Sequence, residues 1–184
     1  AYAIQYLGLM EYAPARPAIE RYLSDPSPIL SLTAFEALSH FTPDKKINAI
    51  FKYIFNRPDI SIPRVSEIVA LWGGTAYPVL VSLLCDTTVS SGAKRLIIDI
   101  LASKRVAESI PAILRCSEKE TDDEIIIGCL KAISLFETPD GFPIAMREIS
   151  SKNWVIRVQA VRALGYVGTT DSIPLIESIF YHDS

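Results

Sequence analysis

Residues 154–165 read WVIRVQAVRALG, and residues 173–180 read IPLIESIF. In both segments the apolar residues recur every three or four positions, as in Val155, Val158 and Val161. This spacing places the side chains on one face of an α-helix, whereas a strand would alternate every second residue. The sequence therefore predicts two amphipathic helices joined by a short connection.

The two-helix pattern recurs along the chain. The last core residue expected in each first helix marks one position of the repeat: Leu7, Leu38, Leu71, Leu101, Ile133 and Leu164. These residues are separated by 31, 33, 30, 32 and 31 positions. A second marker, proline in five repeats of six, opens each second helix: Pro17, Asn48, Pro78, Pro111, Pro143 and Pro174. An internal period of this length indicates a helical-repeat architecture.

Local turn signals divide each repeat into its two helices. Asp25-Pro26, Thr42-Pro43-Asp44 and Thr138-Pro139-Asp140 predict helix starts, because a capping side chain and a proline both suit the first turn. Gly73-Gly74 and Gly168 predict the ends of first helices, where glycine accepts the left-handed conformation. The connections are short, so consecutive helices are expected to lie antiparallel.

We therefore expect an all-α protein, an α-solenoid of about six antiparallel helical hairpins. A single hairpin cannot bury its apolar faces alone, and stacked neighbours bury them continuously. One domain over residues 1–184 is predicted, with repeats at 1–24, 25–57, 58–86, 87–118, 119–150 and 151–184. The chain has no initiator Met and opens like the second half of a helix, so we expect a fragment of a longer protein.

The last repeat carries the motif on which a family resemblance depends. Residues 154–165, followed by Gly168, Asp171 and residues 173–175, resemble the short HEAT-like repeat first described in phycobilisome lyases. The other repeats match more loosely, with Asn48 in place of proline in the second and a shortened turn in the third. The resemblance implies a right-handed superhelix of stacked hairpins of the HEAT/armadillo kind, with second helices lining a concave face and first helices on the convex side.

Composition limits the classes of partner. Hydrophobic residues make up 49% of the chain and charged residues 21%, which excludes disorder. The net charge of −3 is too mild to predict attraction to nucleic acid or to an anionic membrane. No apolar run approaches the roughly 18 residues of a membrane span, and no signal sequence is evident. We expect a cytoplasmic location and no membrane span in this chain, although its parent protein could be anchored elsewhere.

Catalytic and metal-binding patterns are not found in the sequence. The two histidines, His40 and His182, form no cluster, and no Gly-x-Ser-x-Gly or phosphate-loop motif is present. Cys85, Cys116 and Cys129 lie in apolar helical stretches without a C-x-x-C pair, so we expect reduced and buried thiols. The sequence predicts no catalytic residue, no metal and no cofactor.

The second helices carry the pattern that bears most on binding. The positions three and four residues after the proline marker are expected to point into the groove that the resemblance implies. Position four is basic in four repeats of six: Arg21, Lys52, Ser82, Arg115, Arg147 and Ser178. Position three is apolar in the four central repeats: Glu20, Phe51, Val81, Leu114, Met146 and Glu177.

Two interpretations of this pattern remain open. The apolar positions are either the edge of a wide core stripe or an exposed seam, flanked by cations, that receives an extended or helical acidic partner. We expect Phe51 and Met146 to be exposed, because each adjoins a long cation. The candidate partner-binding residues are Arg21, Phe51, Lys52, Leu114, Arg115, Met146 and Arg147.

The favoured function is a scaffold, adaptor or regulatory module that binds a protein or peptide along the concave face and has no enzymatic activity; oligomerisation through the ends of the array is a further expectation. One alternative is a HEAT-like DNA-binding protein or DNA glycosylase, with the four cations on phosphates and Trp72 or Trp154 stacked on a base. Its weakness is the acidic net charge. A bilin lyase-like subunit is the second alternative.

Overall fold

The computed structural model describes residues 1–174, 176 and 177, and these form helices and turns with no strand among them. This confirms the predicted all-α, HEAT-like fold class. By its internal contacts the chain divides into two compact units, Ala1–Leu96 and Ile97–Ser184. Each unit is described separately below.

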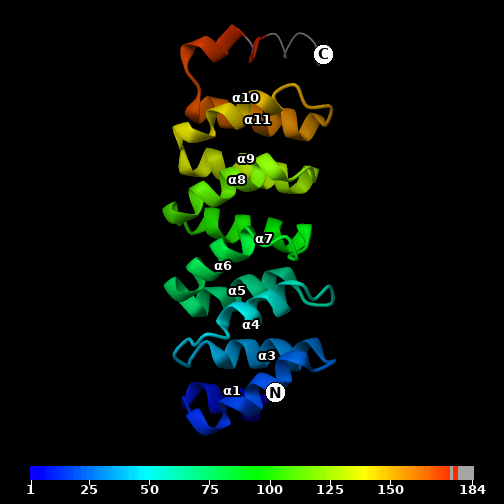
Figure 1. The fold of residues 1–184 in the computed structure, drawn as a ribbon, viewed down its shortest axis with the longest axis vertical. Helices are drawn as coiled ribbons and strands as arrows, with labels where there is room; N and C mark the ends of the chain where they lie inside the picture. The colour runs from blue at the N-terminus through cyan, green and yellow to red at the C-terminus, as the bar shows by residue number, and fades with distance from the viewer. Residues whose placement is uncertain (175, 178–184) are drawn as a thin grey trace. The chain divides into compact units, whose positions relative to one another are not determined.

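Unit 1 is built from helix pairs that follow one another after short connections (Figure 1). The helices are α1 (Tyr2–Leu9), α2 (Arg16–Arg21), α3 (Pro28–Leu38), α4 (Ile47–Phe55), α5 (Ile62–Trp72) and α6 (Ala76–Leu84). The odd-numbered helix of each pair is the first helix of its repeat. First helices of successive repeats pack on each other, as α1 does on α3.

Unit 2 continues the pattern after α7 (Ser91–Ser103), the helix within which the boundary between the units falls. Its further helices are α8 (Ile110–Lys119), α9 (Asp123–Phe136), α10 (Phe142–Glu148) and α11 (Trp154–Val167). Helix α11 packs along α9, and α10 packs against α11 (Figure 1).

Prolines begin the second helices, as the sequence predicted. Pro17, Pro111 and Pro143 lie in the first two positions of α2, α8 and α10. A single 3₁₀ turn precedes each of these helices: Ala13–Ala15, Ala107–Ser109 and Pro139–Gly141. Proline fits there because the first-turn N–H groups have no partner within the helix and the fixed φ of the ring suits helical backbone.

Two other predicted helix starts lie a few residues too early. Asp25 accepts a hydrogen bond of 2.8 Å from the backbone N–H of Ser27, and α3 begins at Pro28. Asp44 accepts one of 2.8 Å from the N–H of Lys46, and α4 begins at Ile47. Both aspartates form turns that lead into the helix, because a short carboxylate reaches the backbone two residues further on.

The turn of the third repeat shifts the helical register by one residue. Gly73 has φ 56°, which ends α5 and separates it from α6. The predicted marker Leu71 is 55% exposed, and Trp72, only 5% exposed, is buried in its place. Val65, Ile68, Val69 and Trp72 form the buried stripe of α5, so Leu71 falls outside the face that packs.

The end of α5 at Gly73 also interrupts a long apolar segment. Pro63–Leu84 has the length and mean hydropathy, 1.5, of a membrane-crossing helix, so the expectation that no apolar run reaches this length was wrong. Core helices of globular proteins can have the same length and hydropathy, and 44% of the 18-residue apolar window within this segment is buried inside the protein. Gly73 also divides the segment into α5 and α6.

Aromatic rings join the second and third repeats in the core of unit 1. Phe35 of α3 contacts Phe51 of α4 edge to face, with ring centroids 5.1 Å apart. Trp72 of α5 lies 5.2 Å from Phe51 and 5.7 Å from Phe35. Rings at these separations contribute about 0.5–1.5 kcal/mol per pair beyond their burial. This aromatic cluster of three rings therefore fixes α5 on the repeat before it.

Aliphatic side chains form the corresponding core of unit 2. Helix α9 contributes Ile126, Leu130 and Ile133, which pack with residues of α10 and α11. The residues supplied by those two helices are Ile144, Ala145, Ile156, Ala160, Ala163, Leu164 and Val167. Three of these are alanines, and small side chains allow neighbouring helices to approach closely.

Close packing of the first helices predicts opposite effects for two glycine substitutions. A Cβ at Gly8 would lie 2.7 Å from the Cα of Ala37, whereas a Cβ at Gly165 would meet nothing within 4 Å. We expect Gly8→Ala to lower the free energy of unfolding by about 1–3 kcal/mol through overpacking. The matched change Gly165→Ala should raise it by roughly 0.5–1 kcal/mol, because alanine favours helix. Urea unfolding measures both; a gain at Gly8 would show that α1 and α3 are further apart.

Candidate functional site

The predicted position-four cations lie mainly at the surface. Arg21, Ser82, Arg115 and Arg147 are exposed and Lys52 is partly buried; Ser178 lies outside the described residues. The periodicity therefore identified the outward side of the second helices. Exposure alone does not leave a cation available to a partner, and two of the four cations form bonds between repeats.

Lys52 links the second repeat to the third. Its Nζ donates to Asp86 Oδ2 at 2.7 Å, and the Thr88 hydroxyl and backbone N–H donate to Asp86 Oδ1 at 2.6 and 2.8 Å. The bond from Lys52, followed by the two from Thr88, holds the pKa of the Asp86 carboxyl well below its usual range. Asp86 follows α6, so this pair connects α4 to the end of the next second helix.

Arg147 makes a similar bond in unit 2. One guanidinium nitrogen donates to the backbone carbonyl of Ser117 at 2.8 Å, and Nε pairs with Glu148 at 2.7 Å. Because Ser117 lies in the last turns of α8, the arginine satisfies a carbonyl near a helix end and joins α10 to α8. Arg115 is exposed and has no ion pair with any residue that the structure describes.

The expectation that Phe51 is exposed was wrong. Its side chain is 0% exposed because it forms the centre of the aromatic cluster with Phe35 and Trp72. Met146, also expected to be exposed, is half-buried, and both it and Leu114 pack against the core of unit 2. Position three is thus largely the edge of the core stripe, the first of the two interpretations above.

The three thiols do not share one environment. Cys116 and Cys129 are buried, as expected, and the Cys129 thiol donates to the carbonyl of Ile113 at 3.6 Å. Cys85 is exposed, which contradicts the prediction. It is the first residue after α6, whose last helical residue is Leu84, so it escapes the buried face.

No constellation for chemistry emerges from the part of the chain that the structure describes. It contains no group of three or more His, Cys, Asp or Glu side chains that could hold a metal ion. His40 is half-buried near the end of α3, and His182 lies outside the described residues.

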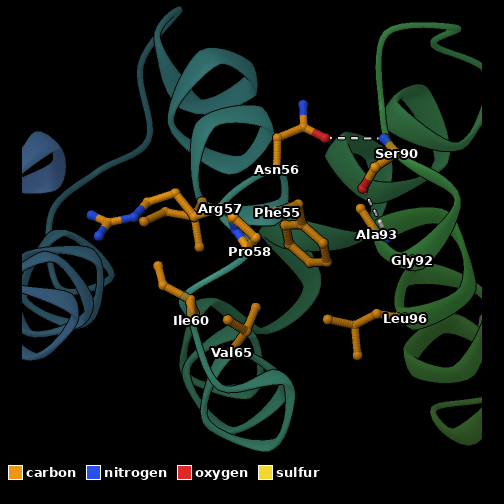
Figure 2. Close-up of a pocket in the computed structure, with 11 residues that line it drawn as sticks. Phe55, Asn56, Arg57, Pro58, Ile60, Val65, Ser90, Gly92, Ala93 and Leu96 are labelled. Atoms are coloured by element: carbon orange, nitrogen blue, oxygen red, sulfur yellow. Dashed lines mark hydrogen bonds between the residues drawn. The ribbon is translucent and has the colours of Figure 1, made fainter.

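A pocket of about 280 Å³ opens in unit 1 where α4 leads into α5 (Figure 2). Phe55, Ile60, Val65 and Leu96 form its apolar walls. At its rim Asn56 accepts a hydrogen bond of 3.0 Å from the backbone N–H of Ser90 (Figure 2). The pocket has few groups that would select a ligand.

The arginine of this pocket is also committed to the fold. Arg57 points away from Leu96 (Figure 2), donates to the carbonyl of Asp25 at 2.9 Å and pairs with Asp59. The bond with Asp59 raises the pKa of the Arg57 guanidinium, so the charge is held in place. The pocket therefore offers shape and apolar contact but no free charge.

An exposed apolar surface flanked by cations lies on α9 and α11. Trp154, Val158 and Tyr166 are 66%, 51% and 53% exposed and lie four or eight residues apart on α11. Arg162 occupies the remaining position of this spacing, so the four side chains share one face of the helix. On α9 the exposed Lys131 and Leu135 hold the equivalent places, 31 residues earlier. These six residues are called the α9–α11 surface below.

Sequence reasoning missed this surface because Val158 was assigned to the core. The actual core positions of α11 are Ile156, Ala160, Ala163, Leu164 and Val167. The available signal was the spacing of four from Trp154 through Val158 to Tyr166, which marks a second apolar stripe beside the core stripe.

Comparison with known families agrees with this architecture. A family model for the PBS lyase HEAT-like repeat matches residues 156–181, which cover most of α11 and the residues after it. Residues 156–181 are thus similar to one HEAT-like repeat. No match was found among curated proteins. The family match accounts for the stacked hairpins and, because HEAT-like repeats serve many purposes, leaves the function to be argued from the surface.

The burial of Phe51 predicts a large effect of its truncation. Phe51→Ala should lower the free energy of unfolding by about 3–5 kcal/mol, because it leaves a cavity between Phe35 and Trp72. Met146→Ala, at a half-buried position, should cost less than about 2 kcal/mol. Chemical denaturation of the two variants decides this. Equal, small losses would return both residues to an exposed seam.

The thiol environments predict selective labelling. In the native protein Cys85 should react rapidly with a thiol reagent, while Cys116 and Cys129 should react only on unfolding, because burial denies the reagent access. Mass spectrometry of the labelled peptides identifies each site. In the control variant Cys85→Ser the rapid phase should disappear; a rapid phase that persists would place another thiol at the surface.

Proposed function

We propose that this chain is a protein-binding repeat module, a scaffold or adaptor without catalysis of its own, and that the α9–α11 surface receives the partner. The observation that carries the proposal is the exposure of Trp154, Val158 and Tyr166 along one face of α11. Surface apolar residues that are scattered singly need no explanation, whereas aligned ones mark an interaction site.

The residue types also favour a protein partner. Tryptophan, tyrosine and arginine supply a disproportionate share of binding energy at protein interfaces, because they combine a large contact area with a polar group. Trp154, Arg162 and Tyr166 bring all three types to one helical face. Leu135 of α9 extends the apolar area onto the neighbouring helix.

The face of the second helices remains the alternative surface within the same function. On that face Arg115 is exposed and Leu114 and Met146 are half-buried. Lys52 and Arg147 are engaged in bonds between repeats, and Phe51 is buried. The contacts that remain to a partner are therefore fewer than the sequence suggested, and we rank this face second.

Selection from a displayed random-peptide library against the purified chain tests the proposal. The peptides recovered should bind the double variant Trp154→Ala, Tyr166→Ala at least tenfold more weakly than the parent chain, since both anchors would be lost. The matched control removes two exposed tyrosines of α1, Tyr2 and Tyr6, which are 79% and 64% exposed, and should bind within twofold of the parent.

The outcomes separate the surfaces. Peptides lost on Arg115→Ala, and retained by the Trp154, Tyr166 variant, would move the site to the second helices. A library that yields no peptide above background, together with tight binding of duplex DNA, would replace the protein-binding proposal with the nucleic-acid alternative.

A further inference from the structure

A pocket of about 170 Å³ lies within the α9–α11 surface. Its lining consists of Lys131, Ser134 and Leu135 from α9 with Arg162 and Tyr166 from α11. The 31-residue offset between the helices sets Lys131 beside Arg162 and Leu135 beside Tyr166 as repeat equivalents. One end of the pocket is therefore basic and the other apolar.

Both cations of the pocket are available. Lys131 and Arg162 are exposed, and neither forms an ion pair with any other residue in the described part of the chain. The lining contains no carboxylate. Lys52 and Arg147, by contrast, are already bonded to neighbouring repeats. Two cations beside one pocket, without an ion-pair partner among the described residues, attract an anion.

The other groups specify what accompanies the anion. The Ser134 hydroxyl donates to the carbonyl of Leu130 at 3.1 Å, so its proton is already used within α9 and the charge of the anion is met by the two cations. Leu135 and Tyr166, 42% and 53% exposed, offer apolar contact next to the cations. Such a site suits a carboxylate that has an apolar neighbour in its own chain.

The combination is restricted to these two helices. At the equivalent positions of α7 the chain has Asp99 and Ser103, and at those of α3 it has Glu36 and His40. In α9 and α11 a cation lies two residues before the first marker residue of the repeat, and an apolar residue lies two residues after it. This pair is therefore not a general property of the repeat. Because only α9 and α11 carry this pair of residues, the surface that can bind an anion is short, and so is the acidic segment that fits it.

We propose that this pocket binds a carboxylate side chain of an acidic peptide segment in the protein partner, with an adjacent apolar residue lying over Leu135 and Tyr166. The inference rests on the protein-binding function proposed above and names the chemistry of that partner. A nucleic acid would need a longer series of free cations, since its affinity grows with the number of phosphates neutralised.

A pair of synthetic peptides tests the inference. One alternates glutamate with leucine and phenylalanine, and the other replaces every glutamate by glutamine. With the acidic peptide, ¹⁵N-labelled protein should show chemical-shift changes for amides of α9 and α11, and the affinity should fall at higher salt. The glutamine peptide should bind at least tenfold more weakly. Equal binding of the two peptides would overturn the inference.

Charge reversals provide the matched control. Lys131→Glu with Arg162→Glu should abolish the shift changes, whereas Lys104→Glu with Lys152→Glu alters the net charge equally, at other exposed sites, and should leave affinity within twofold. Equal loss in both double variants would show non-specific attraction and overturn the inference. Lys131→Gln with Arg162→Gln, checked by circular dichroism, repeats the test without introducing repulsion.

The two proposals can fail separately. If library-selected neutral peptides still need Trp154 and Tyr166 but ignore the charge reversal, the protein-binding function stands and the carboxylate pocket is refuted. If a short DNA duplex binds more tightly than the acidic peptide and competes at the same amides, the partner chemistry assigned here is wrong.

Discussion

A helical hairpin leaves its apolar faces open until a neighbouring hairpin covers them, and the rest of this structure depends on that constraint. In unit 1 the cover between the second and third repeats is aromatic, through Phe35, Phe51 and Trp72. In unit 2 it is aliphatic, with small residues such as Ala160 that let α11 lie close to α9. Burial between hairpins extends to position three of the second helices. The apolar residues expected to form an exposed seam there therefore belong mostly to the core.

Some cations that the sequence offers for binding a partner instead form polar bonds between repeats. Lys52 bonds to Asp86, and Arg147 bonds to the carbonyl of Ser117. Exposed pairs of this kind contribute little to stability individually. They do fix the side chains and neutralise or occupy their charge, so a row of cations on a repeat protein is not by itself a binding surface.

The α9–α11 surface differs because its side chains are neither buried in the core nor, among the described residues, bonded to a neighbouring repeat. Its apolar residues lie beside the core stripe, and within the described part of the chain Lys131 and Arg162 lack bonds of the kind that hold Lys52 and Arg147. Aromatic anchors next to free cations combine the area and the charge that protein recognition needs.

The sequence by itself determined the helical repeat, the proline starts of α2, α8 and α10, and the end of α5 at Gly73, because these follow from spacing and backbone chemistry within a few residues. Tertiary structure alone decided that Trp72 rather than Leu71 is buried, that Cys85 is exposed, and that Phe51 is core. A period of 3.6 residues orders the faces of a helix, but the width of the buried face and the pairing of a cation depend on a neighbour about 30 residues away.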